Sequence, residues 1–538
     1  MLRIISVSRS FVVAALVAAG CTKGGKFIEV TTADGSSAKL AVTESLRVNL
    51  NTEPSTLNWT IASDSTSTEV TTNLMDGLVL YDLYDKDMKL VPGLALKWEP
   101  SEEARRWKFT LREGVVWNDG VPFTPQHAID GWKYLLTKST ASSYSYFLFG
   151  IKNARAFHEG KVEWNEVGAK ITGPNEISVE LERPMSYFPY LLTHHSTWPV
   201  RMDVIEKHGA QWAMPGKIVT LGPYNLKSWE HDHLIALERN ESYYGEKAKI
   251  KNVVNYMIIE QATAINLYES GKLDVVSQVP SVERRKLRGR KDFYEEPTLS
   301  LYYYGMNVTK PPMNDANVRK AIAHAIDRNE IIRMLGGGQA PTSSWVPKGM
   351  FGFEENIGLK FDPAKARQLI AKAGYKNGVG FPRIELAFNQ NEDHQRIAEN
   401  VQAQLKRNLG ISVELRNVEW KVYISQVKTD APQLFRYGWL ADYPDPDNYL
   451  ALMTGYSENN HTKWKSARFD EYVIEGSSLV DLEKRRKVYA QAQKLLVEEE
   501  VPAIPILTST EGMLVSPRIT GFPHNVMRVR SYKGVSLK

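Results

Sequence analysis

A single cysteine in 538 residues is the feature that most limits what this chain can fold into. One thiol excludes an intrachain disulfide and every metal or iron–sulfur site that needs several cysteines. This residue, Cys21, follows two arginines, an apolar run over 11–19 and small residues at 18–20. The pattern is typical of a secretory signal peptide and is too short for a membrane-spanning helix.

The residues Ala18 to Cys21 resemble the bacterial lipobox, in which the signal peptide is cleaved before a cysteine that carries diacylglycerol. We therefore expect residues 1–20 to be a lipoprotein signal peptide and Cys21 to be the lipidation site. An ordinary signal peptide with a chance cysteine is the alternative. Residues 21–45 show little apolar periodicity, which predicts a flexible lipidated tether. The mature chain is expected to be exported, in the periplasm or on the outer face of the cell membrane, and to be anchored by its lipid. Which membrane carries the anchor stays open.

The composition of the remaining chain is that of a globular protein with room for about three domains. Hydrophobic residues make up 43% and charged residues 24% of the sequence. The formal net charge of +5 is small for this length, so no nucleic-acid partner is expected. After residue 20, no apolar run approaches the ~20 residues that a membrane-spanning helix needs.

Helix and strand patterns mix along the chain without a repeat, which predicts an α/β fold. Apolar and polar residues alternate over 107–111 and 177–181, as in half-buried strands. Thr124-Pro125 and Asp362-Pro363 are signals for the start of a helix. Helix-then-strand patterns at 262–276 and 397–415 lie far apart and predict at least two α/β lobes. We expect ordered hinge strands to cross between the lobes near residues 300 and 508.

Catalytic signatures are absent from the sequence. It contains no Gly-x-Ser-x-Gly elbow, no phosphate-binding P-loop and no His-Glu-x-x-His pair. His194-His195 and the pair His231 and His233 lack a third metal ligand, and we interpret them as surface histidines. The acidic segment 442–448 has two prolines and lacks the glycine and distal glutamate of a calcium loop. We expect no catalytic residue, no cofactor and no metal site.

Aromatic residues interleaved with single charges stand out at 302–307, 420–423 and 436–442. Together with several other motifs, they resemble the bacterial extracellular solute-binding proteins of oligopeptide and dipeptide ABC importers, the oligopeptide-binding members above all. The resemblance extends from about residue 46 to residue 529. The motifs that carry it are Glu53-Pro-Ser-Thr-Leu57, Trp107 to Arg112, Trp117 to Gly120, Leu237 to Asn240, Tyr302-Tyr-Tyr304, Asn317 to Arg328, Gly438 to Asp442 and Asp445 to Asn448.

This resemblance implies a type II periplasmic-binding-protein fold, in which two lobes are joined by hinge strands and an extra third domain is added. The implied limits are 46–66, 197–299 and 509–538 for lobe I, 67–196 for domain II and 300–508 for lobe III. The resemblance also implies a monomeric, non-enzymatic protein. Such a protein closes on an extended oligopeptide between its lobes and delivers this ligand to the membrane subunits of an ABC permease.

The resemblance also assigns ligand-binding residues. Asp442 matches the acid that pairs with the free α-amino group of the peptide, although a turn-capping acid is the alternative. Strand edges around Ser55 and at Gly438 to Leu440 are expected to hydrogen-bond the peptide backbone. Arg436 is expected near a peptide carboxylate. The other positions that match channel or pocket residues are Glu53, Tyr144, Gln278, Tyr303, His394, Trp420 and Trp439.

Some positions depart from the pattern of the close relative. Gly305, Gln278, Thr298, Val427 and Lys428 replace residues of its side-chain pockets, so the resemblance does not define peptide length or side-chain preference. Three other functions stay open. The same fold could bind another cargo, such as a nickel chelate, haem, a murein peptide or an oligosaccharide. An exported hydrolase and a chaperone-like lipoprotein that binds unfolded proteins are the remaining alternatives.

Overall fold

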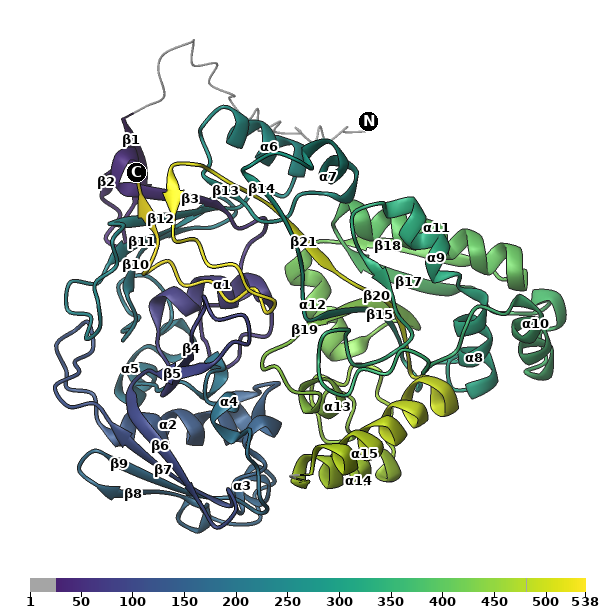
Figure 1. Ribbon diagram of the computed structural model, residues 1–538, viewed down its shortest axis with the longest axis horizontal. Coiled ribbons are helices and arrows are strands. Elements are labelled where there is room, and N and C mark those ends of the chain that lie inside the picture. The colour runs from purple at the N-terminus through teal and green to yellow at the C-terminus, as the bar shows by residue number, and fades with distance from the viewer. Residues whose placement is uncertain (1–25, 480) are drawn as a thin grey trace, which may run out of the picture.

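The computed structural model describes residues 26–479 and 481–538, and two large β-sheets lie side by side in it (Figure 1). Below, lobe I denotes the seven-stranded sheet with its helices, domain II the four-stranded sheet with its helices, and lobe III the six-stranded sheet with its helices. Domain II lies beneath lobe I in Figure 1, and lobe III lies to the right. Strands and helices alternate within both lobes, so the α/β class predicted from the sequence is confirmed.

The sheet of lobe I brings together strands that are far apart in the sequence. Its order is β10–β11–β12–β3–β13–β21–β14. All five residues of β3 are buried, as expected for a central strand that pairs in parallel on both sides. The strands are β3 (Ser45–Asn49), β10 (Tyr224–Glu230), β11 (Leu234–Arg239), β12 (Asn252–Tyr256), β13 (Val275–Val276), β14 (Phe293–Pro297) and β21 (Thr510–Val515), and the helices are α1 (Ser65–Leu74), α6 (Gln261–Glu269) and α7 (Ser281–Leu287).

Domain II is an antiparallel sheet covered by short helices. Helix α2 begins at Pro125, as predicted, and buries one apolar face that includes Ala128, Trp132 and Leu136. The strands, in sheet order, are β6 (Ala95–Ser101), β7 (Arg106–Leu111), β9 (Glu176–Glu180) and β8 (Ala169–Gly173). The helices are α2 (Pro125–Leu136), α3 (Ala154–His158), α4 (Phe188–Leu191) and α5 (Met202–His208), and a two-stranded sheet of β4 (Val79–Tyr81) and β5 (Leu90–Pro92) adjoins them.

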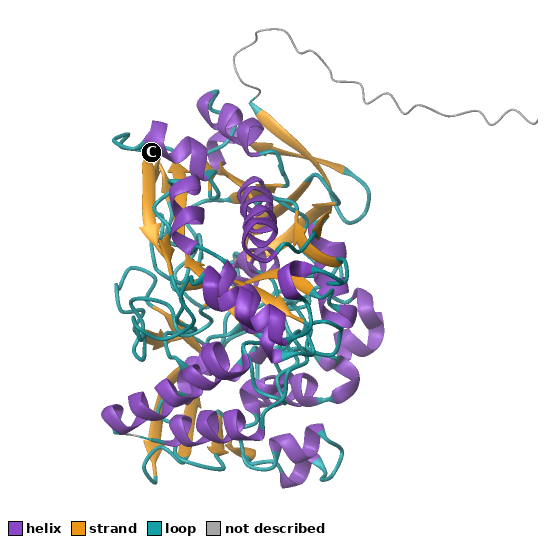
Figure 2. Cartoon of the chain, turned by 90° about the vertical axis from the view of Figure 1, so that its right-hand side faces the viewer, coloured by secondary structure: helices purple, strands orange, loops and turns teal. Residues whose placement is uncertain are grey.

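The sheet of lobe III contains the strand that forms one wall of the cleft, β19. Helix α11 is capped by Asn391, ends at Gly410 in a left-handed conformation and leads into β18, as the sequence predicted. The strands, in sheet order, are β16 (Ala340–Pro341), β20 (Ala503–Thr508), β15 (Ser300–Met306), β19 (Leu434–Leu440), β17 (Ile384–Asn389) and β18 (Val413–Val418). The helices that pack on this sheet or lie beside it (Figure 2) are α8 (Ala316–Ala325), α9 (Arg328–Leu335), α10 (Pro363–Lys372), α11 (Glu392–Leu409), α12 (Trp420–Asp430), α13 (Asp447–Ala451), α14 (Ala467–Ser478) and α15 (Leu482–Lys494).

Two neighbouring connections join lobe I to lobe III. The first runs from β14 to β15 through Thr298 and Leu299, and the second runs from β20 to β21 through Ser509. The backbone N–H and the hydroxyl of Thr298 both donate to the Ser509 carbonyl, at 3.2 and 3.0 Å. We propose that these hydrogen-bonded connections are the hinge and that they set the predicted domain limits near 300 and 508.

A buried ion cluster stabilises lobe I. Asp274, which is 1% exposed, accepts bonds of 2.9 and 2.8 Å from Arg47 and of 2.6 and 2.7 Å from Arg518. Burial would raise the pKa of this carboxyl, but the two guanidinium groups outweigh burial and lower it. The cluster joins β3, the chain before β13 and the segment after β21, three parts that are distant in sequence.

The structure corrects the predicted tether over residues 21–45. Residues 26–45 are ordered, because β1 (Phe27–Thr31) and β2 (Ser37–Ala41) form an antiparallel hairpin. Val30 and Leu40 of this hairpin are buried against Leu234 and Val254 of lobe I. The Thr31 N–H also donates to Glu230 at 2.6 Å. The apolar residues at every second position of β1 and β2 account for this burial. The Gly and Ser residues of the segment made this alternation hard to recognise in the sequence. Cys21 and the signal peptide lie outside the described residues.

Candidate ligand-binding site

A cleft between the lobes contains two connected cavities, of about 350 and 570 Å³. Lobe I supplies residues of α1 and of the chain around β21, and lobe III supplies β19 and the start of α12. Both cavities are lined by Tyr302, Trp420, Arg436 and Glu511, among others, so they form one elongated space. A cleft that consists of two joined cavities and is lined by both lobes suits an extended ligand.

The edge of β19 that faces this cleft is open. β19 pairs with β15 along its whole length, but β17 pairs only with Leu434 and Phe435. Ala441 donates to the Leu299 carbonyl, and antiparallel pairing alternates along a strand, so the N–H and C=O groups of Gly438 and Leu440 point away from β15. Both residues line the first cavity. These groups can hydrogen-bond the backbone of an extended ligand whatever its side chains are.

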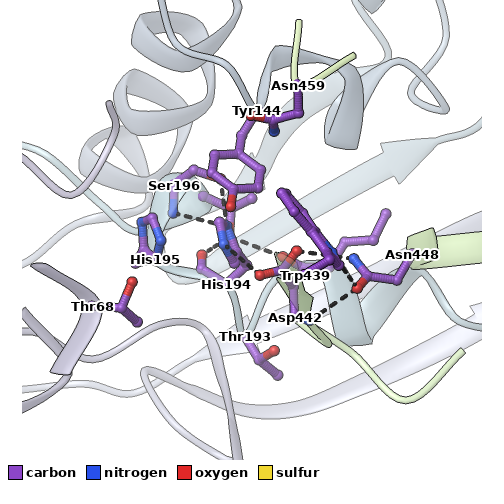
Figure 3. Close-up of polar contacts among 12 residues, drawn as sticks. Thr68, Tyr144, Thr193, His194, His195, Ser196, Trp439, Asp442, Asn448 and Asn459 are labelled. Carbon is purple, nitrogen blue, oxygen red and sulfur yellow. Dashed lines mark hydrogen bonds and ion pairs between the residues drawn. The ribbon is translucent and has the colours of Figure 1, made fainter. Parts of the chain in front are cut away.

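Asp442 follows this open edge and lies in the first cavity (Figure 3). Its Oδ2 accepts from Asn448 Nδ2 at 3.0 Å, and its own N–H donates to Asn448 Oδ1 at 3.0 Å. Its Oδ1 lies 3.4 Å from His194 Nε2, on the opposite wall. No Lys or Arg of the described chain lies within 4.0 Å of this carboxylate, whose side chain is 14% exposed. The acid therefore has no Lys or Arg partner in the cleft, which suits it to bind a ligand ammonium group.

Arg436 connects the two cavities at the other end of the open edge. Its guanidinium carbon lies 4.8 Å from the centre of the Tyr302 ring, and Nη1 donates to Asn389 at 3.3 Å. Within the described residues, Arg436 has no carboxylate within 4.0 Å. Burial, helped by the charge of Arg436, lowers the pKa of His394 well below its usual value and keeps this ring neutral. Arg436 is therefore suited to meet an anionic group of the ligand.

Comparison with known proteins identifies the family. Residues 89–461 match the model of the bacterial extracellular solute-binding proteins, family 5. The oligopeptide-binding protein OppA of Bacillus subtilis is 31% identical over 491 residues, which cover 88% of this chain and 89% of that protein. The chain belongs to the family 5 solute-binding proteins. Members of this family bind solutes and are not enzymes, which agrees with the absence of catalytic motifs.

Solved structures show which arrangement of the lobes this solute-binding protein adopts. Haemophilus influenzae OppA in complex with the peptide RPPGFSPFR is 27% identical and matches with a TM-score of 0.87, covering 93% of this chain and 99% of that one. The murein tripeptide-binding protein MppA of Escherichia coli is 29% identical and also matches at 0.87, over 93% of this chain and 99% of that one. The unliganded open form of MppA, at the same identity and with coverage of 93% and 98%, matches at only 0.62. The lobes are therefore arranged as in the peptide complex, and the three-domain fold of the family is confirmed.

The structure places most of the predicted site residues of the solute-binding protein in the cleft. Tyr144, Gly438, Trp439, Leu440 and Asp442 line the first cavity, Gln278 and His394 line the second, and Trp420 and Arg436 line both. The Tyr144 ring lies 6.2 Å from the Trp439 ring, centre to centre, so domain II and lobe III meet beside Asp442.

Three predicted residues lie elsewhere. Glu53 lines neither cavity, because its carboxylate accepts bonds from Trp229, His231 and the N–H of Asp232 at the turn between β10 and β11. Ser55 lies in no strand, and its hydroxyl donates to Asp64, the residue that caps α1. Both act as structural supports of lobe I.

Tyr303 is the third of these residues, and it points away from the cleft. Successive side chains of a strand face opposite sides, and here Tyr302 faces the cleft while Tyr303 packs 4.9 Å from the ring of Trp345. Tyr302, and not Tyr303, therefore lines the cleft, and alternation along the strand was the signal that distinguishes the two.

The structure also corrects the interpretation of His194 and His195 as surface residues. They are 6% and 3% exposed. Their ring centres lie 3.9 Å apart, and His195 Nδ1 donates to the Trp59 carbonyl at 2.6 Å. Burial, with His194 adjacent, lowers the pKa of His195 well below its usual value. His231 and Asp232 form the β10–β11 turn. Sequence reasoning missed His194 as a partner of Asp442 because this contact depends on the tertiary fold. It also missed Asn448, which is close to Asp442 in the sequence.

Residues 26–479 and 481–538 contain no group of three His, Cys, Asp or Glu side chains that could hold a metal ion. In the same part of the chain, no helix is long and apolar enough to cross a membrane.

Proposed function

We propose that this protein is the substrate-binding component of an ABC peptide importer and that it captures extended oligopeptides with a free amino terminus between its lobes. The observation that carries the proposal is the partly buried carboxylate of Asp442, which has no Lys or Arg partner in the described chain and adjoins the open edge of β19. An ammonium group supplies the missing charge, and the strand edge supplies hydrogen bonds to the peptide backbone. The oligopeptide- and murein-peptide-binding names of its relatives support the same class of ligand.

Arg436 completes the proposed ligand site. Arg436 lies in β19 and Asp442 follows its end, so a peptide that lies along β19 with its amino group at Asp442 extends toward Arg436. Its carboxylate, or an acidic side chain, can there accept hydrogen bonds from a guanidinium that no acid of the described chain neutralises. Because backbone groups provide most of these contacts, the site accepts peptides of many sequences.

Delivery to a permease follows from closure of the lobes. A peptide that contacts both walls favours the closed arrangement, and the closed protein carries the peptide to the membrane subunits. We further propose that Cys21 carries the lipid that holds the monomer at the membrane, outside the cytoplasm. Replacing Cys21 with Ser should then move the protein from the detergent phase to the aqueous phase in a detergent phase-partition assay.

Native mass spectrometry of the purified mature protein tests the proposed cargo. The spectrum is recorded as purified and again after unfolding, dialysis and refolding. We expect extra masses that match a heterogeneous set of short peptides and that disappear on refolding. A single non-peptide mass would instead identify another cargo of this fold. Binding of unfolded proteins without bound peptide would support the chaperone-like alternative.

A further inference from the structure

His194 is the residue that faces Asp442 from across the cleft (Figure 3). It lies between α4 and the short helical turn His195–Thr197, whereas Asp442 follows β19 of lobe III. His194 Nε2 lies 3.4 Å from Asp442 Oδ1. This separation is slightly longer than the typical N–H···O distance of about 2.9 Å. A shift of a few tenths of an ångström therefore completes the hydrogen bond. The contact joins the two walls and exists only when they are close together.

The local backbone determines which ring nitrogen of His194 carries the proton. His194 caps the helical turn, because its Nδ1 accepts from the N–H of Ser196 at 3.3 Å. A backbone N–H can only donate, so Nδ1 is the unprotonated nitrogen of the neutral ring and Nε2 carries the hydrogen. The Ser196 hydroxyl lies 2.8 Å from the same Nδ1 and is free to donate as well. The N–H of the ring is therefore directed at Asp442.

The carboxylate of Asp442 is held from two sides. Asn448 Nδ2 donates to Oδ2 at 3.0 Å, and Asn448 is itself fixed because its Oδ1 accepts from the Trp439 indole at 3.0 Å. His194 faces the other oxygen. Both partners are neutral donors, so they orient the carboxylate without cancelling its charge. Each carboxylate oxygen has two acceptor positions, which leaves room for a ligand ammonium group at Oδ1.

Aromatic rings shield this contact from water. The ring centre of His194 lies 4.3 Å from that of Tyr144 and 4.8 Å from that of Phe147, and its side chain is 5% exposed. Charge-assisted hydrogen bonds are stronger in such an enclosed setting than in water. A small change in the direction of the carboxylate therefore alters the strength of amino-group binding.

We propose that His194 is a positioning residue for the ligand's amino group. Its neutral ring donates Nε2–H to Asp442 Oδ1 when the lobes close, and this bond fixes the carboxylate in the direction that the ammonium group needs. The inference rests on the proposed function, since it concerns the same end of the cleft. It adds that amino-group recognition is completed only by closure, because one of the two donors to the acid belongs to the opposite wall.

Two substitutions separate this role from the structural role of His194 as a helix cap. His194→Asn keeps an oxygen close to the position of Nδ1, so it can cap the turn, but its amide is too short to reach Asp442. His194→Gln places an amide N–H near the position of Nε2 and lacks the capping acceptor. If His194 positions Asp442, the Gln variant retains function and the Asn variant loses it. A capping role alone predicts the opposite order.

The assay measures preference for a free amino group. Refolded, ligand-free protein is mixed with equal amounts of a random tetrapeptide pool and of the same pool after Nα-acetylation. Mass spectrometry then gives the ratio of free to acetylated peptides in the bound fraction. We expect His194→Asn to lower this ratio about tenfold, the lower end for a hydrogen bond to a charged group. His194→Gln should stay within about threefold of the wild type, the size of a weak hydrogen bond.

The outcomes distinguish the inference from the proposed function. A wild-type ratio near one would overturn capture through the α-amino group, and the role of His194 with it. A high wild-type ratio that His194→Asn leaves unchanged would overturn the role of His194 alone. Loss in His194→Gln alone, accompanied by a lower thermal midpoint of that variant, would show that His194 is only a structural cap. Equal loss in both variants would also contradict the positioning role.

Discussion

Replacing Asp442 with Asn should weaken the binding of peptides with a free amino terminus at least ~30-fold. Asn preserves the volume of the side chain and removes its charge. Two opposite unit charges 4 Å apart attract each other by about 4 kcal/mol at an effective dielectric constant of 20, and desolvation offsets part of this attraction. Removing one member of such a buried pair costs about 2–5 kcal/mol, and the lower value corresponds to ~30-fold in affinity. Asp442 is partly buried, with 14% of its side chain exposed, so we use the lower value.

Isothermal titration calorimetry with one of the co-purified peptides, resynthesised with a free and with an acetylated amino terminus, measures this effect. Asp430→Asn is the matched control, because it changes the net charge equally at an exposed acid that pairs with Lys310 outside the cleft. The acetylated peptide should bind wild type and Asp442→Asn with similar, weak affinity. The reasoning is wrong if Asp442→Asn binds the free peptide within threefold of wild type, or if the control loses affinity to the same extent.

Three further predictions concern the strand edge and stability. Leu440→Pro removes one N–H from the open edge of β19 and should weaken peptides of every sequence about 3- to 10-fold in calorimetry, with an unchanged thermal midpoint. Burial lowers the pKa of His461 to about 3, so below about pH 6.5 the unfolded chain binds a proton that the folded protein does not. Stability is then lost as the pH falls, by about 2 kcal/mol between pH 8 and pH 5 for this residue, and chemical denaturation of His461→Gln should show a pH dependence smaller by that amount. Asp274→Asn leaves Arg47 and Arg518 without their shared carboxylate and should lower the free energy of unfolding by about 3–5 kcal/mol, whereas an unchanged thermal midpoint would contradict this.

The local elements of the fold were predictable from the sequence. Residues 397–409 have an apolar residue every fourth position and end at Gly410, and the helix and the following strand occur where this pattern puts them. Helix α10 likewise begins at Pro363, and Asp362 caps it. These signals involve residues within about one helical turn of each other, so they depend little on the rest of the chain.

The site was predictable only in part, because its contacts join distant segments. Glu53 is a buried acid with three donors, and all of them lie more than 170 residues away in the sequence. The family resemblance placed it in a ligand pocket, and only the fold shows that it supports a turn. His194 was misjudged for the same reason, because a histidine is polar and its burial depends on Tyr144, Phe147 and Asp442.

Buried polar atoms without partners explain why a ligand should favour the closed arrangement. Within the described chain, Arg436 Nε, His394 Nδ1 and Trp420 Nε1 are buried and have no hydrogen-bond partner in the protein, and all three residues line the second cavity. An unsatisfied buried donor or acceptor costs about 1–3 kcal/mol, so each of these atoms that neither water nor a ligand reaches makes the closed arrangement less favourable. These atoms are covered in the described arrangement, so a peptide can supply acceptors and donors to them only after the side chains turn toward it. We therefore expect the unliganded protein to favour the open form, with the polarity of the cleft as the cause.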